Sequence, residues 1–149
     1  MTTFAVQTTI DAPVTAVWQA LADIGTIYQW NPGVKASHRT SEQAEGVGAC
    51  RYCDLGGKNY LEERVVAWEP EKQLTMRITG TNLPFKTADI RFTLTPVGDQ
   101  TAVTVSPLYQ LHYGLAGRLL DRLYVQGNYQ KGMTSLLAGL KKYVEEYSE

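Results

Sequence analysis

The stretch IDAPVTAVWQALADIGTIYQWNP, residues 10–32, decides the fold. Asp11 is placed to cap a helix, and Pro13 suits the first turn because its missing N–H would have no partner there. Apolar residues then recur three or four positions apart, which predicts a helix to about Ala22. A second short helix is expected over 24–30, ended by the Asn-Pro pair that follows.

Strands are expected on both sides of these helices. Residues 3–10 alternate between apolar and polar side chains, which is typical of a strand. Six further strand candidates follow, separated by turns that contain Gly, Pro, Asn or Asp: 34–41, 47–55, 59–68, 72–80, 85–96 and 100–109. Links this short allow only antiparallel neighbours, so the sequence predicts a seven-stranded antiparallel sheet.

The last part of the chain, residues 115–147, carries one continuous helical pattern, about 50 Å long if unbroken. Residues spaced alternately four and three apart form one stripe: Leu119, Leu123, Gln126, Gln130, Met133, Leu137, Leu140, Val144 and Tyr147. The middle of this stripe is polar. Either it faces a wet or ligand-filled space, or a kink at Gly127 or Gly132 turns it to solvent.

Composition narrows the class of protein. A chain of 149 residues with 44% apolar and 19% charged residues is expected to fold as one globular domain, 1–149. The net charge of −1 gives no reason to expect nucleic acid or an anionic membrane as partner. No apolar run is long enough to span a bilayer, and the N-terminus does not resemble a signal peptide, so a cytoplasmic location is expected.

The two cysteines, Cys50 and Cys53, have the CxxC spacing of redox and zinc sites. Their context favours a structural role instead. They lie in a predicted strand, where residues three apart point to opposite faces and can neither share a zinc ion nor form an undistorted disulfide. We therefore expect both thiols to be free, with no metal site and no cofactor.

The order of these elements resembles the SRPBCC superfamily, the START-like, helix-grip group that includes polyketide cyclase/dehydrase-like and lipid-transport proteins. The resemblance covers nearly the whole chain and is carried by Ile10, Pro13, Val17, Trp18, Leu21, Asp23, Trp30, Pro32, Gly46, Gly48, the segment 62–65, Leu74, Thr101, Leu137, Leu140 and Lys141. It implies an α+β helix-grip fold: a seven-stranded antiparallel sheet wrapped around a long C-terminal helix, with two short helices between strands 1 and 2. Members bind lipids, sterols, hormones or polyketides between sheet and helix, and a minority catalyse aromatisation or cyclisation.

Candidate ligand-binding residues come from the expected inner faces, the long helix and the loops near the expected cavity. Aromatic side chains that combine an apolar ring with a polar group suit an amphipathic ligand. The candidates are Trp30, Tyr52, Tyr60, Glu63, Met76, Phe92, Tyr109, His112, Tyr113, Gln126, Gln130 and Met133. Gln126, Gln130 and Met133 are expected to line the cavity opposite inner-face residues such as Met76 and Phe92.

Two charged candidates have competing interpretations. Glu62 and Glu63 are adjacent on a strand, so one of them points to the concave side and needs a partner there, either Arg51 or Arg77. Such a pair can orient a ligand, move a proton or only tie the sheet together. His112 could act as an acid or base near neutral pH, or be a solvated loop histidine. No residue can be named as catalytic.

The leading hypothesis is that the protein binds a small apolar or amphipathic molecule, lipid-, sterol- or polyketide-like. A polyketide cyclase or dehydratase is the first alternative, and an interaction module that uses its outer surface is the second. The oligomeric state stays open.

Overall fold

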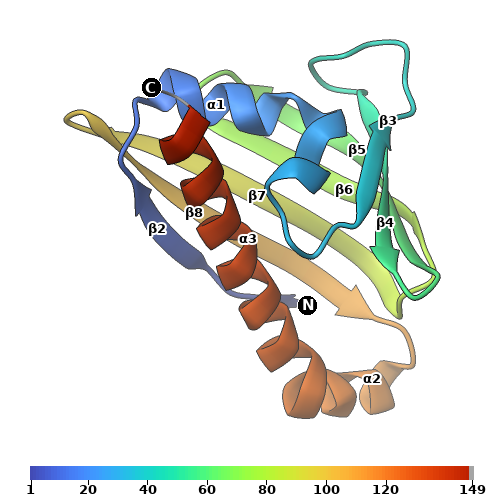
Figure 1. The fold of residues 1–149 in the computed structure, drawn as a ribbon. Coiled ribbons are helices and arrows are strands. Elements are labelled where there is room, and N and C mark those ends of the chain that lie inside the picture. The colour runs from blue at the N-terminus through green and yellow to red at the C-terminus, as the bar shows by residue number, and fades with distance from the viewer. Residues whose placement is uncertain (148–149) are drawn as a thin grey trace.

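In the computed structural model, which describes residues 1–147, a curved sheet wraps around a long C-terminal helix (Figure 1). The elements are, in order, β1 (Thr2–Thr3), β2 (Val6–Ile10), α1 (Val14–Ala22), the 3₁₀ helix η1 (Ile24–Gln29), β3 (Ala36–Arg39), β4 (Cys50–Gly56), β5 (Asn59–Glu69), β6 (Gln73–Thr81), β7 (Phe85–Val97), β8 (Gln100–Leu111), α2 (Gly114–Leu120), the π-helical turn η2 (Asp121–Val125) and α3 (Gln126–Tyr147). This is the helix-grip fold that the sequence predicts.

All strands are antiparallel, in the order β1-β8-β7-β6-β5-β4-β3, with β2 also beside β8. The sheet has eight strands rather than seven because the first predicted strand is interrupted. Its two pieces pair with β8 in one register, Thr2 with Tyr109 and Val6 with Val105. The strand predicted over 34–41 is shorter than expected, four residues at the edge of the sheet.

The first helix, α1, ends at Ala22 as predicted but begins at Val14, later than a cap at Asp11 would give. Pro13 occupies the N-cap position without a side-chain cap, and Asp11 lies too far upstream. Asp11 instead donates its backbone N–H to Glu145 Oε2 at 2.7 Å, which fastens the chain to α3. Val17, Trp18 and Leu21 form the buried face of α1, so the predicted apolar spacing is confirmed.

The helix after β8 differs most from expectation. The π turn η2 accommodates one extra residue, which rotates the preceding helix by about 100° relative to α3. Leu119 and Leu123, expected on the buried stripe, are therefore 60% and 61% exposed, whereas Asp121 is buried. The irregularity lies upstream of Gly127 and Gly132, and α3 is one continuous helix through both glycines.

The core lies between α3 and the concave face of the sheet. Met133, Leu136, Leu137, Leu140 and Val144 form the buried face of α3. A close approach fixes the position of this helix: a Cβ on Gly139 would collide with the carbonyl oxygen of Trp30 at the end of η1.

Candidate functional site

A cavity of about 450 Å³ lies between the concave face of the sheet, α3 and the loop after η1. The lining comes from β4 to β7, from η1 and the loop after it, and from η2 and α3. It comprises Ile27, Asn31, Gly33, Val34, Arg51, Cys53, Leu55, Leu61, Glu63, Ile78, Leu83, Pro84, Phe85, Ile90, Phe92, Val125, Asn128, Tyr129, Gly132, Met133 and Leu136. The walls are mostly aliphatic or aromatic, and Gly33, Asn128 and Gly132 are exposed where the cavity opens.

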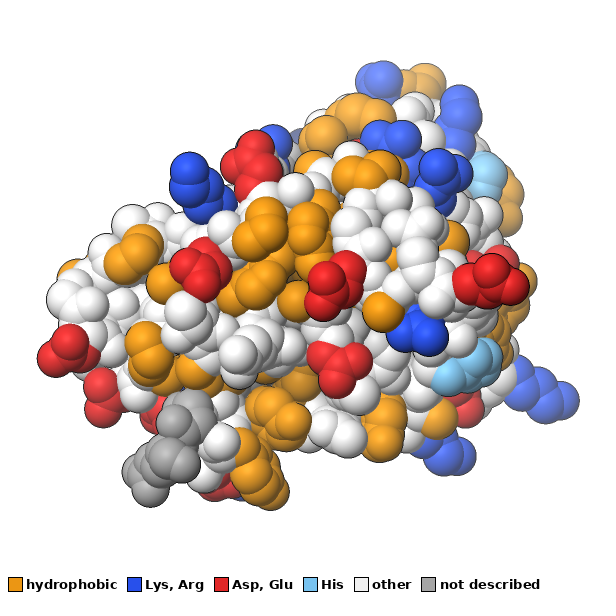
Figure 2. Space-filling model, turned by 90° about the horizontal axis from the view of Figure 1, so that it is seen from above, with side chains coloured by type: hydrophobic (Ala, Val, Ile, Leu, Met, Phe, Trp, Pro, Cys, Tyr) orange, Lys and Arg blue, Asp and Glu red, His pale blue; other side chains and the backbone are white. Residues whose placement is uncertain are grey.

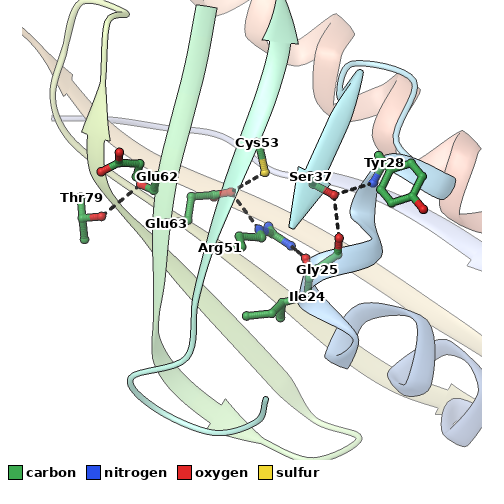
Figure 3. A network of polar contacts seen from close by, with 9 residues as sticks. All are labelled: Ile24, Gly25, Tyr28, Ser37, Arg51, Cys53, Glu62, Glu63 and Thr79. Atoms are coloured by element: carbon green, nitrogen blue, oxygen red, sulfur yellow. Dashed lines mark hydrogen bonds and ion pairs between the residues drawn. The ribbon is translucent and has the colours of Figure 1, made fainter. Parts of the chain in front are cut away.

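The main charged feature of the lining is a buried ion pair between two neighbouring strands. Arg51 Nε on β4 donates to Glu63 Oε1 on β5 at 3.0 Å, and the two side chains are only 5% and 3% exposed. Arg51 Nη1 also donates to the carbonyl oxygen of Ile24 at 3.2 Å, so the guanidinium joins the sheet to η1 (Figure 3). A buried charge needs such partners because an unpaired one is costly.

The two adjacent glutamates of β5 point to opposite faces of the sheet. Glu63 points toward Arg51 and the cavity, while Glu62 lies on the other face of β5 (Figure 3). Arg51 is the partner of Glu63. Arg77, the other candidate, pairs with Asp89 on the exposed face, with Nε 2.9 Å from Oδ1.

The Cys53 thiol completes this polar group. Its Sγ lies 3.7 Å from Glu63 Oε1, as a hydrogen-bond donor. Burial raises the pKa of Cys53 to about 12; Arg51 opposes this rise, and Glu63 adds to it through its charge and hydrogen bond. The thiol is therefore neutral near pH 7 and not a nucleophile. Cys50 lies on the opposite face of β4, and both cysteines are free.

Tyr129 is a lining residue that the sequence did not reveal. Its ring packs against Phe4, Phe85 and Tyr109, with centroids 5.5, 5.6 and 5.1 Å away. Burial raises the pKa of Tyr129, and the charge of Glu63 and the nearby Tyr109 raise it further. The phenol is thus a neutral donor near pH 7.

A second group of hydrogen-bonded polar side chains lies next to Tyr129. The Tyr109 hydroxyl donates to Asp121 Oδ1, and Thr2 Oγ1 donates to Asp121 Oδ2, both at 2.5 Å. Burial raises the pKa of Tyr109, and the hydrogen bond and charge of Asp121 add to the rise. Asp121 thereby joins the first strand, the last strand and the π turn.

The structure brings only part of the predicted set together. Glu63, Phe92 and Met133 line the cavity. Met76 and Tyr109 are fully buried, but they belong to the packing around the cavity and not to its lining.

The other candidates lie elsewhere. Tyr52 and Tyr60 stack on the outer face of the sheet, where Tyr52 also stacks on His38, because Arg51 and Cys53 take the inward positions of β4. Trp30 is buried among core residues outside the cavity. His112, Tyr113 and Gln130 are exposed, and Gln126 is half-buried outside the lining.

The predicted stripe follows the wrong register along α3 at Gln126 and Gln130. Tyr129, four residues before Met133, lines the cavity, whereas Gln130, three residues before it, is exposed. The polar middle of the helix does face the cavity, but through Asn128, Tyr129 and Gly132. Leu119 and Leu123 could not indicate this register, because the π turn puts them out of phase with α3, and its sequence, DRLYV, has no feature that predicts the turn.

Two further observations bear on the class of site. Within residues 1–147, no group of three or more His, Cys, Asp and Glu side chains is arranged to hold a metal ion. In the same part of the chain, no helix is both long and apolar enough to cross a membrane.

Comparison with known proteins agrees with this architecture. Residues 1–145 match the family described as polyketide cyclase/dehydrase and lipid transport. A protein of Thermus thermophilus is similar in structure, with a TM-score of 0.82 and 22% identity over 99% of this chain and 100% of that one. A START superfamily protein of Mycobacterium smegmatis has a TM-score of 0.79 and 17% identity over 97% of both chains. No curated protein sequence gives a match.

An enzyme is also among the similar structures. The Zhui aromatase/cyclase of a Streptomyces species has a TM-score of 0.78 and 14% identity, over 99% of this chain and 96% of that one. Identities this low establish a common fold and not a common activity. The chain belongs to the polyketide cyclase/dehydrase and lipid transport family.

Proposed function

We propose that the protein binds a small apolar or amphipathic molecule in the cavity between the sheet and α3. The observation that carries the proposal is the lining: a space of about 450 Å³ with mostly apolar walls and a few converging polar groups. Ligand sites in proteins typically combine this range of volume with this kind of wall.

The polar groups favour an uncharged oxygen on the ligand. Glu63 already compensates the charge of Arg51, so the pair offers little net attraction to an anion. The Tyr129 phenol is neutral and lines the cavity, so it can donate a hydrogen bond to the ligand. A ketone, phenol or alcohol oxygen would satisfy it, while the apolar body of the ligand packs on Phe92 and Met133.

A cyclase or dehydratase is the second candidate, and it rests on the same groups. Glu63 is a carboxylate and Tyr129 a phenol, and both line the cavity beside a space that could hold a flexible substrate. Such enzymes need a positioned proton acceptor and donor. Conversion of a bound compound would support this candidate, whereas saturable binding without turnover would support a binding protein.

The test is a thermal-shift and fluorescence screen with neutral compounds: N-phenyl-1-naphthylamine as the probe, then sterols, fatty alcohols and aromatic ketones. At a hundredfold excess over its dissociation constant, a ligand should stabilise the protein by about 2.7 kcal/mol. Gly132 is exposed and lines the cavity where it opens. A leucine side chain at this position would block the opening, so Gly132→Leu should abolish the stabilisation by ligand.

Gln130→Leu is the matched control, since Gln130 lies two positions away on the same helix and faces solvent. It should leave probe binding unchanged. If no compound stabilises the protein, or if both leucine variants weaken binding equally, the cavity is not the binding site.

A further inference from the structure

The helix that follows β8 carries an uncovered row of apolar side chains, the α2 patch. Leu115, Leu119 and Leu123 lie one turn apart and are 79%, 60% and 61% exposed. Tyr113 and Tyr124 flank the row and are 74% and 62% exposed. Large apolar side chains that cluster on a surface indicate an interaction site.

The opposite side of this helix is firmly held, so the row cannot turn inward. Asp121 is buried and accepts hydrogen bonds from Tyr109 and Thr2. Gly117 lies against the backbone of His112, so closely that a Cβ would collide with its carbonyl oxygen. The packing of Asp121 and Gly117 therefore keeps the three leucines on the surface.

The exposed charged side chains of the segment that carries the α2 patch, residues 112–131, are all basic. Arg118, Arg122 and Lys131 are exposed, while the one acidic residue in the segment 112–131 is Asp121, which is buried. The net charge of −1 for the whole chain hides this local excess of positive charge. The end of the molecule around α1, by contrast, mixes acidic, basic and apolar side chains (Figure 2).

We propose that the α2 patch docks on the surface of an anionic phospholipid bilayer. A helical face with leucines beside basic residues is the pattern of helices that lie in the membrane interface, and tyrosine is favoured at that depth. A second copy of the chain is a poorer occupant, because pairing two α2 patches would bring arginines close to arginines without an exposed acid in the segment.

The α2 patch lies next to one end of the cavity. Val125, in the turn after Leu120, lines the cavity, as does Pro84, whose carbonyl oxygen accepts the backbone N–H of His112. A docked helix would hold this end of the cavity close to the lipid. The proposal does not depend on the proposed ligand, since it rests on the outer surface alone.

The experiment is co-sedimentation of the full chain with vesicles, either of phosphatidylcholine alone or of a three-to-one mixture with phosphatidylglycerol. The protein should bind the anionic vesicles, and added salt should weaken the binding. Leu119→Gln with Leu123→Gln should lower the partition coefficient about tenfold or more. Arg118→Gln with Arg122→Gln should lower it about fivefold for each charge, on anionic vesicles only.

The matched control is Val47→Gln with Val97→Gln, since Val47, in the loop before β4, and Val97, at the far end of β7, are 57% and 54% exposed away from α2. It should bind vesicles like the original chain. The leucine variant should keep its circular dichroism and its binding of N-phenyl-1-naphthylamine, which separates failure of docking from failure of the cavity.

Two results would overturn the proposal. One is equal sedimentation of the original chain and the leucine variant. The other is a homodimer in solution that the leucine variant disperses while neither binds vesicles, which would assign the α2 patch to a second copy.

Discussion

The ion pair of Arg51 and Glu63 is the residue-scale feature on which the cavity depends. Both side chains are almost fully buried, and the guanidinium also holds η1 through the carbonyl of Ile24. Pairs of this kind stabilise a fold less than their geometry suggests, because removing both charges also removes the cost of their desolvation. Removing only one of the two side chains is costly, because the other charge then stays buried without a partner.

Arg51→Met should destabilise the protein by about 3–5 kcal/mol, because it leaves the Glu63 carboxylate buried without its partner. The double variant Arg51→Met with Glu63→Leu should recover most of this loss. Urea denaturation measures both. Arg77→Met is the control for an exposed pair and should cost about 1 kcal/mol or less. Equal effects of the two single variants would contradict the burial of the Arg51 pair.

The two tyrosines beside the cavity make stability depend on alkaline pH. The folded state raises the pKa of Tyr109 and of Tyr129, above all through burial. Their contribution to stability is fully present below the unfolded phenol pKa of about 10, and it is lost as the pH rises through the folded values.

In a spectrophotometric titration, two of the nine tyrosines should therefore ionise only together with alkaline unfolding. Tyr109→Phe and Tyr129→Phe should each remove half of this late absorbance change. A late change that neither variant reduces would show that other phenols are the protected ones.

At the scale of elements, the contact between α3 and η1 decides where the helix lies. Gly139→Ala should destabilise the protein by about 1–3 kcal/mol, because the new Cβ would collide with the carbonyl oxygen of Trp30. Gly127→Ala is the matched control on the same helix. It meets open space and should stabilise by up to about 1 kcal/mol, as alanine does in an exposed helix. Thermal unfolding of both variants would reveal a wrong placement of α3 if their effects had the same sign.

The elements themselves were largely predictable from the sequence. Alternation and turn residues locate the strands to within a few residues, because a half-buried strand has only one period that fits. The phase of the helix before Gln126 was not predictable, because it is set by a π turn in which Asp121 is buried and accepts hydrogen bonds from Tyr109 and Thr2. A local sequence pattern contains no information on those contacts.

At the scale of the whole molecule, the candidate site was predictable only in part, because some of its lining residues are set by tertiary contacts and not by local sequence patterns. Family resemblance predicts a cavity between sheet and helix, and strand alternation and the helical stripe predict Phe92 and Met133 beside it. The choice between Glu62 and Glu63 was open from the sequence, and the structure places Glu63 in the lining. The inward face of β4 could not be assigned, because Tyr52 and Cys53 are both compatible with a buried position. In the folded protein Arg51 and Cys53 take the inward positions of β4. The stacked rings of Tyr52 and Tyr60 therefore lie on the outer face of the sheet.

The ties between the ends of the chain have a consequence for the order of folding. Thr2 bonds to Asp121, Asp11 to Glu145, and the ammonium group of Lys141 to the carbonyl oxygen of Thr9. The first strand thus finds β8 and α3 only after the residues up to about Glu145 have been synthesised. Until then its edge is unpaired on the ribosome, and we expect closure of the sheet to be a late and slow step, as in other folds of high contact order.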